Sequence, residues 1–480
     1  MMSIKKFFTT YWLLITIIIV FVVAEVWSML ALSVPSWDGT VYVGMGKYLF
    51  SHGTIGTWEA LRPVGLPIIL GACWKLGINP YIAGDIFSLI ISIGLIILIY
   101  VCAERAKKGT GSIAAALLSS CGIFFMYGAV PLTDITSAFF ALWALYFAYT
   151  GTRNRDYFIA GLLVASAFMF RFPQGLMLVI IAILLVVQLF QSKGKFDKRL
   201  ETFIERGFLT LAGFFAIVLP YLLTNIHFYG NAFLPFIEGT QSIKGYASLY
   251  DLGFWYYFSQ LFKQDPLFIL AFISIVLLFW KKIYRNKTLI AISIALLIFA
   301  AYFIYEPHKE IRYAIAFLPY VVVLTAVAIG YILERFKLSP LLFFGLFIIV
   351  GFMIHADSLI HIPYDPNAAT FYAFDTYLDN APGARTLMAT PYTFEYSDVL
   401  LTHNLYGNWN NAYDTYNSFR STNDYIALDS CNLKLGCADD STCRDEKQPL
   451  LTELQQQDTK VFSAVTPESK CVLSIYKINH

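Results

Sequence analysis

Long apolar runs alternate with short polar segments over residues 1–360 of the 480-residue chain. The first run, residues 11–32, is long enough to cross a bilayer as a helix, and ten more runs follow it. They cover residues 81–102, 112–128, 135–150, 157–170, 172–190, 207–226, 266–280, 288–304, 313–333 and 339–356. The pattern predicts an all-α polytopic membrane region of about eleven transmembrane helices.

Positively charged residues gather in every second loop between these runs. They are Lys5, Lys6, Arg105, Lys107, Lys108, Arg153, Arg155, Lys193, Lys195, Lys198, Arg199, Arg206, Lys281, Lys282, Arg285, Lys287, Arg335 and Lys337. If the spans alternate, all of them lie on one side of the membrane, which the positive-inside rule makes the cytoplasmic side. We therefore expect an uncleaved first helix with a cytoplasmic N-terminus, and extracytoplasmic loops opposite.

A first external loop, residues 33–80, does not fit the simple alternation. Its apolar stretch 68–76 is too short for a span and is interrupted by Pro67 and Gly71. We expect a helix that lies in the membrane interface or dips partway into the membrane, preceded by an amphipathic helix near residues 41–50. The apolar face predicted to enter the headgroup layer contains Val41, Met45, Tyr48 and Leu49.

The composition becomes polar after Ile360 and stays polar to His480. Strand-like runs at 385–390, 425–430, 460–464 and 471–478 alternate with a helix-like run at 446–457. The pattern predicts two domains: a membrane domain, 1–360, and a small external α/β domain, 361–480.

Overall composition agrees with an integral membrane protein, with 58% hydrophobic and 14% charged residues. The net charge of +2 gives no sign of a nucleic-acid partner. Three cysteines in apolar runs are expected to be packing residues: Cys73, Cys102 and Cys121. Four cysteines in the tail favour disulfides, with a zinc site as the alternative: Cys431, Cys437, Cys443 and Cys471.

Acids and cations gather in the loops predicted to be extracytoplasmic. They are Asp38, Glu59, Arg62, Asp134, Arg171, His308, Lys309, Glu310 and Arg312, with Trp37 and Trp58 beside the first three. Ionisable groups among aromatics at a membrane surface indicate a ligand that is part polar and part lipid. The alternatives are an ordinary loop with an aromatic belt, helix caps for Asp38 and Asp134, and a snorkelling role for Arg171.

Two functional classes fit this distribution of charge. A transporter or flippase for a lipid-linked sugar is expected to carry polar groups near mid-bilayer on broken helices. Here the spans are mostly free of charge, which favours an enzyme acting on a lipid-borne substrate at the interface. In such an enzyme an acid such as Asp38 is suited to general-base catalysis, and nearby cations are suited to holding a phosphate.

Several motifs resemble the GT-C superfamily of membrane glycosyltransferases. W-D-G-T-V-Y and L-R-P-V-G-L-P in the first loop, and P-L-T-D-I-T-S-A-F-F at 131–140, resemble the protein O-mannosyltransferase-like branch. G-T-W-E-A-L-R-P and H-K-E-I-R-Y-A-I-A-F-L-P at 308–319 are similar to the branch that builds lipid-linked oligosaccharides and GPI anchors. Gly39 stands where the first branch has a second acid, and Tyr313 where the second has phenylalanine.

The resemblance implies an inverting transfer of a sugar, with mannose expected, from a polyprenyl-phosphate donor to a lipid-linked glycan or protein. It implies that Asp38 is the general base. The cations at the donor phosphate would be His308, Lys309 and Arg312, followed by Arg171 and Arg62, while Glu59, Asp134 and Glu310 orient cations or bind sugar. No cofactor is expected, although acids beside a phosphate would permit a divalent metal. The expected location is a prokaryotic plasma membrane, or the endoplasmic reticulum in a eukaryote, with the site and the tail extracytoplasmic.

Overall fold

The computed structural model describes residues 4–30, 36–192, 195–245, 252–280, 286–339, 368–381, 383–388, 394, 397–404, 412–430 and 440–480. The chain divides into two compact units. The helical unit contains Met1–Ser28, Ala60–Pro63 and Phe87–Ile360. The mixed unit contains Met29–Glu59, Val64–Ile86 and His361–His480. Each unit is described by itself.

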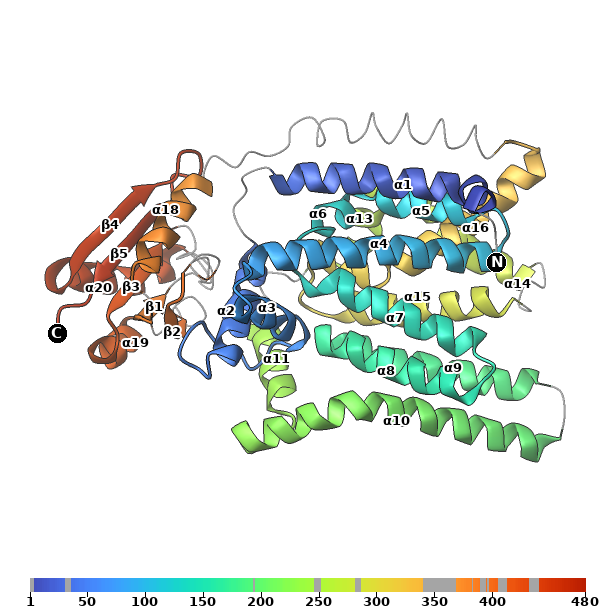
Figure 1. The fold of residues 1–480 in the computed structure, drawn as a ribbon, viewed down its shortest axis with the longest axis horizontal. Coiled ribbons are helices and arrows are strands. Elements are labelled where there is room, and N and C mark those ends of the chain that lie inside the picture. Colours follow the sequence, from blue (N-terminus) through green and yellow to red (C-terminus); the bar gives the residue numbers. More distant parts are fainter. Residues whose placement is uncertain are drawn as a thin grey trace. The chain divides into compact units, whose positions relative to one another are not determined.

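The helical unit is a bundle of long helices (Figure 1). Its α-helices are α1 (Ile4–Leu30), α4 (Pro80–Ala106, which begins in the mixed unit), α5 (Gly111–Ser119), α6 (Gly122–Tyr127), α7 (Thr133–Thr150), α8 (Asn154–Phe170), α9 (Leu176–Gln191), α10 (Phe196–Tyr229), α11 (Leu234–Gly245), α13 (Tyr256–Gln264), α14 (Ile269–Trp280), α15 (Lys287–Tyr305) and α16 (Leu318–Phe336). Short 3₁₀ helices η1 (Phe172–Gly175), η2 (Pro266–Phe268) and η4 (Ile311–Ala316) connect them. Their buried side chains are mainly apolar.

Within the described residues, six helical segments are long and apolar enough to cross a membrane. They are Tyr11–Leu30, Pro80–Ala106, Phe172–Gln191, Phe196–Tyr229, Lys287–Tyr305 and Leu318–Phe336. The expected spans at 135–150 and 157–170 form α7 and α8, which fall short of the same criterion. The chain is thus a polytopic, mainly α-helical membrane protein with a small C-terminal α/β domain, as the sequence predicts.

One predicted span consists of two helices in the structure, and another cannot be compared with the structure. The run 112–128 is broken between α5 and α6, where Cys121 has an extended backbone with φ −70° and ψ 118°. Each half is too short to cross a bilayer, so this prediction of a single span is wrong. The run 339–356 lies outside the described residues from 340 onward.

The C-terminal part of the mixed unit contains a five-stranded sheet in the order β2-β1-β3-β5-β4. The strands are β1 (Arg385–Met388), β2 (Leu400–Asn404), β3 (Tyr425–Asp429), β4 (Thr459–Val465) and β5 (Val472–Lys477). β1 pairs parallel with β2 and β3, whereas β5 pairs antiparallel with β3 and β4. Four of the strands and α20 (Asp440–Gln457) were expected; β2, α18 (Ala368–Asp379), α19 (Ala412–Phe419) and η7 (Arg420–Thr422) were not.

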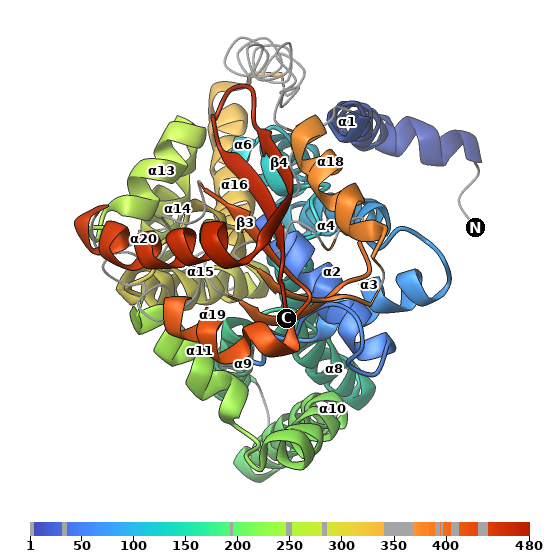
Figure 2. The ribbon, with the colours of Figure 1, turned by 90° about the vertical axis from the view of Figure 1, so that its left-hand side faces the viewer.

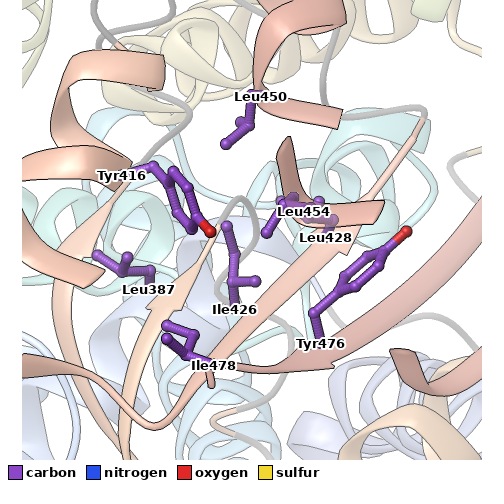
Figure 3. Packing of buried hydrophobic residues seen from close by; sticks show 8 residues of the cluster. All are labelled: Leu387, Tyr416, Ile426, Leu428, Leu450, Leu454, Tyr476 and Ile478. Carbon is purple, nitrogen blue, oxygen red and sulfur yellow. The ribbon is translucent and has the colours of Figure 1, made fainter. Parts of the chain in front are cut away.

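Helices cover both faces of this sheet. Figure 3 shows the cluster between the sheet and helices α19 and α20, formed by Leu387, Tyr416, Ile426, Leu428, Leu450, Leu454, Tyr476 and Ile478. Phe462 and its neighbour Ile475 point to the other face, because side chains alternate along a strand and Tyr476 faces the cluster. The Phe462 ring contacts Phe374 and Tyr377 of α18, which therefore packs on that second face (Figure 2).

The first-loop helices α2 (Trp37–Phe50) and α3 (Gly65–Lys75) belong to the mixed unit and pack against each other. The expectation that α2 lies in the headgroup layer on one apolar face is wrong. Every residue from Gly39 to Lys47 is buried, Val41 and Met45 completely, because neighbouring elements cover α2 on all sides. The division into domains 1–360 and 361–480 stays a prediction, although contacts group α2 and α3 with the C-terminal residues.

The cysteines of the apolar segments are packing residues, as expected. Cys102 and Cys121 are buried and Cys73 is half-buried, and all three are free thiols. Of the tail cysteines, Cys431 and Cys437 lie outside the described residues, as does the side chain of Cys443. Cys471 is buried. Disulfides in the tail therefore remain a prediction.

Candidate active site

Asp134 and Arg171 form a buried ion pair in the helical unit. Asp134 lies in the first turn of α7 behind Leu132, the N-cap residue, so the predicted alternative of a capping aspartate is wrong. Arg171 stands between α8 and η1 with an extended backbone, where Pro173 in the first turn of η1 needs no intrahelical hydrogen bond. Their side chains are 3% and 15% exposed, so Arg171 is held by a carboxylate within the bundle.

The segment after α15 supplies the second group of charges. Pro307 follows the end of α15, and the chain then runs extended at Glu310 into η4, which packs against α6, α7 and α13. Glu310 collects its neighbours: its carboxylate lies 2.8 Å from His308 Nε2 and 2.6 Å from Arg312 Nε. One carboxylate thus orients two basic side chains at once.

Tyr313 connects the two groups. Its hydroxyl donates a hydrogen bond of 3.1 Å to Glu310 Oε1. The guanidinium of Arg171 lies over the same ring at 4.3 Å from the centroid, and that of Arg312 at 5.6 Å. Two arginines from distant parts of the chain therefore converge on one aromatic ring, in a cation–π arrangement that is stronger where water is excluded.

Lys309 is the most unusual residue of the segment. The residue as a whole is only 5% exposed. Within the described part of the chain, its ammonium has no ion pair and no hydrogen bond. A largely buried cationic residue without a counter-charge is costly, so this position is suited to an anionic ligand.

Tyr257 of α13 is a site residue that the sequence reasoning missed. It is 1% exposed, its hydroxyl has no hydrogen-bond partner among the described residues, and its ring contacts Phe317 edge-on. Burial raises its pKa, nearby Tyr313 and Glu310 raise it further, and Arg171 opposes them. The hydroxyl therefore stays protonated and can donate to a ligand. Only its position in a run of aromatics, 254–258, marked it in the sequence.

The other three predicted site residues belong to the first loop. Asp38 lies in the first turn of α2, whose N-cap is Ser36, so Asp38 is not the cap that the alternative interpretation required. It is half-buried, as are Glu59 and Arg62. Asp38 and Glu59 fall in the mixed unit, while Arg62 falls in the helical unit. The roles assigned to all three stay predictions.

No group of three or more His, Cys, Asp or Glu side chains in the described ranges is arranged to share a metal ion. Asp134 and Glu310 are instead each engaged by an arginine. The expectation that no cofactor is needed stays a prediction.

One family of known proteins matches part of this sequence. Residues 62–224 match the family described as dolichyl-phosphate-mannose-protein mannosyltransferase. The matched segment includes Arg62, Asp134 and Arg171 but ends before the 308–313 cluster. None of the curated proteins compared with the chain matches it.

Solved structures resemble the chain over almost its full length. ArnT from Cupriavidus metallidurans bound to undecaprenyl phosphate is 12% identical, with a TM-score of 0.62 and coverage of 97% of this chain and 98% of ArnT. The Archaeoglobus fulgidus oligosaccharyltransferase tethered to an acceptor peptide is also 12% identical, with a TM-score of 0.61 and coverage of 98% and 74%. The archaeal enzyme AglB from the same organism, in complex with an inhibitory peptide and a dolichol-phosphate, gives 11% and 0.58, with coverage of 98% and 75%.

Identities this low establish a common fold and nothing finer. That fold agrees with the family match in residues 62–224 and with the motifs of the first loop and of residues 308–319. The chain therefore shares the fold of these solved structures, which are GT-C membrane glycosyltransferases.

Proposed function

We propose that the chain is a glycosyltransferase that moves a sugar from a polyprenyl-phosphate donor to a lipid-linked glycan or protein acceptor. The observation that carries this proposal is the convergence of Arg171 and Arg312 on Tyr313, in a segment that also contains the largely buried Lys309. Guanidinium groups suit phosphate oxygens because their donors form a planar fork. Two structural neighbours are complexes with a polyprenyl phosphate, which supports the same ligand class here.

The proposed reaction is a single inverting displacement. The acceptor oxygen bonds to the anomeric carbon as the bond from that carbon to the phosphate oxygen breaks, and the lipid phosphate leaves with the electron pair. Asp38 takes the acceptor proton as general base. Negative charge grows on the leaving phosphate, so fixed cations at its oxygens stabilise the transition state more than the ground state.

Within this proposal the two acids of the helical unit have a supporting task. Asp134 holds Arg171 and Glu310 holds His308 and Arg312, so the cations are oriented before the donor arrives. Such preorganisation avoids the cost of ordering long side chains during the reaction. Mannose is the sugar that the matched family's description favours. Arg62 and Glu59 are assigned to the donor as well, on the motif evidence alone.

We further propose that the reaction takes place at the extracytoplasmic face, of a plasma membrane or of the endoplasmic reticulum. The positive-inside rule favours a cytoplasmic location for the basic loops, and hence for the face opposite the proposed site. Arg171 and the 306–313 segment follow the C-terminal ends of α8 and α15, whose N-termini Asn154 and Lys287 lie in those basic loops. The cation cluster is thus at the end of the bundle away from them.

Replacing Lys309 by methionine tests the phosphate site. The apolar side chain fits a buried position and removes no hydrogen bond or ion pair within the described residues, so the protein should fold normally. Loss of a charge-assisted hydrogen bond should raise the donor KM by about 10–100-fold. The control is Lys263→Met, since Lys263 is an exposed lysine of α13 in the same unit. Equal donor KM for Lys309→Met and wild type, measured with a labelled polyprenyl-phosphate sugar, would place the phosphate elsewhere.

A further inference from the structure

Helix α2 connects the proposed base to a buried lysine. Asp38 lies in its first turn and Lys47 in its last, about 14 Å apart along the helix axis at 1.5 Å per residue. All residues between them are buried, so the helix is held firmly along its length. Because a helix of this length behaves as a rigid rod, whatever holds Lys47 also sets the position of Asp38.

Lys47 is held by the C-terminal domain. Its Nζ lies 2.9 Å from Asp398 Oδ1 and donates a hydrogen bond of 2.9 Å to the carbonyl of Ser397. The lysine side chain is 3% exposed. Burial lowers the pKa of Lys47, and the charge and hydrogen bond of Asp398 are the main effects that oppose this lowering. The charged lysine therefore depends on Asp398.

Asp398 also contacts α3. The indole Nε1 of Trp74 donates a hydrogen bond of 3.2 Å to the same oxygen, Oδ1, that binds Lys47. A single carboxylate just before β2 thus joins both helices of the first loop to the sheet. Replacing it would loosen two contacts at once.

Backbone hydrogen bonds make a second, independent link between the first loop and the sheet. Gly56 donates a hydrogen bond of 2.8 Å to the Val399 carbonyl and accepts one of 2.8 Å from Leu401, so it pairs with the edge of β2. Gly56 has φ +89°, and a Cβ there would lie 2.1 Å from the carbonyl oxygen of Gly44 in α2. Only glycine permits this approach of the loop, α2 and the sheet edge.

We propose that the C-terminal domain is a positioning device for the catalytic base. In this account Asp398 is a positioning residue that acts on Asp38 through Lys47 and α2. This inference rests on the proposed function and adds a role for the tail, to which no sequence motif points. The side chain of Asp398 acts only by fixing the helix, so its loss should lower turnover more than donor affinity.

The test combines hydrogen exchange with kinetics on the full-length protein in lipid nanodiscs. In Asp398→Asn, amide exchange over residues 40–47 should rise by about tenfold or more, because the buried lysine loses its counter-charge. kcat should fall by about 10–100-fold with donor KM within about twofold of wild type. Asp398→Glu, which restores the charge, should recover most of both losses.

A matched control separates positioning from general damage to the tail. Arg420 pairs with Asp458 at 2.9 Å inside the C-terminal domain and lies in η7, on the α19 side of the sheet. Arg420→Gln should loosen the tail without changing α2 exchange or kcat. Trp74→Phe removes the second contact to Asp398 without burying a lone charge, so it serves if Asp398→Asn does not fold. It should lower kcat by about two- to fivefold.

Each outcome has a distinct meaning. Unchanged exchange in α2 for both Asp398→Asn and Trp74→Phe overturns the inference, whatever the activity. So does a loss of kcat in Arg420→Gln equal to that in Asp398→Asn, because the tail would then act through its overall stability. Faster exchange in α2 with normal kcat would support the anchoring of α2 by Asp398. It would count against Asp38 as base, and hence against the proposed mechanism.

Discussion

Replacing Asp38 by asparagine should lower turnover by about 10²–10⁴-fold while leaving donor affinity largely unchanged. Asparagine keeps the size and the hydrogen-bonding oxygen of aspartate, but it cannot take a proton from the acceptor hydroxyl. Asp38 is not the N-cap of α2, so the substitution removes no cap, and the loss of a charge in the first turn costs about 0.3–2 kcal/mol. The measurement is kcat and donor KM with a labelled donor at saturating acceptor.

Glu59→Gln is the matched control for Asp38→Asn, because both acids are half-buried first-loop carboxylates of the same unit. We expect Glu59→Gln to change KM more than kcat, since Glu59 is assigned to donor binding. Near wild-type turnover of Asp38→Asn would move the base to another acid, with Glu59 and Asp134 the first to test.

In contrast to Asp38→Asn, Arg312→Ala should weaken donor binding. It should raise donor KM by about 10–100-fold and lower kcat as well. Arg312 would bind the phosphate in the ground state and bind it more strongly as its charge grows. Glu310 keeps two partners in this variant, His308 at 2.8 Å and Tyr313 at 3.1 Å, so the segment should stay folded.

Arg312→Lys provides the control for Arg312→Ala. Lysine keeps the positive charge but not the planar fork, so it should recover part of the affinity and little of the rate. If Arg312→Ala binds the donor as tightly as wild type, the phosphate does not lie at this cluster. Measured affinities should come from direct binding of labelled donor, so that a change in the rate-limiting step cannot imitate a change in affinity.

The sequence predicted the helical membrane region well because apolar length and loop charge are direct physical requirements of a bilayer. It failed at 112–128, where a continuous apolar run hides a break at Cys121. Periodicity cannot show such a break, because the residues on both sides are equally apolar. Four strands of the tail were predicted where β-branched and aromatic residues cluster. The sequence of β2, which contains His403 and Asn404, has only a weak strand pattern, so β2 was missed.

The candidate site was predicted as a list of residues but not as an arrangement. Asp134, Arg171 and Glu310 were expected as separate loop residues, and the structure shows that arginine–carboxylate pairs and the ring of Tyr313 connect them. Tyr313 departs from the family pattern, and its hydroxyl makes a contact that phenylalanine cannot make. Arg171 and Tyr313 are 142 residues apart in sequence, and a contact between such distant residues cannot be inferred from one sequence.

Two other features were out of reach for the same reason. Nothing in the local sequence of Lys47 indicates a partner at Asp398, 351 positions away. A lysine in the last turn of a short amphipathic helix is usually a solvated residue that favours the helix dipole. Tyr257 likewise stands in a stretch rich in aromatics, where only the fold distinguishes a buried hydroxyl from a membrane-interface residue.

Transfer of labelled sugar tests the central claim most directly. Membranes of cells that make this protein naturally, deleted for its gene and then complemented, would receive a radiolabelled polyprenyl-phosphate hexose on the face opposite the basic loops. We predict that label enters a lipid-linked glycan or a protein with the wild-type gene and not with Asp38→Asn or Arg312→Ala. Intact labelled donor crossing to the other face in a gene-dependent way, with no label in any acceptor, would contradict glycosyl transfer and indicate a flippase.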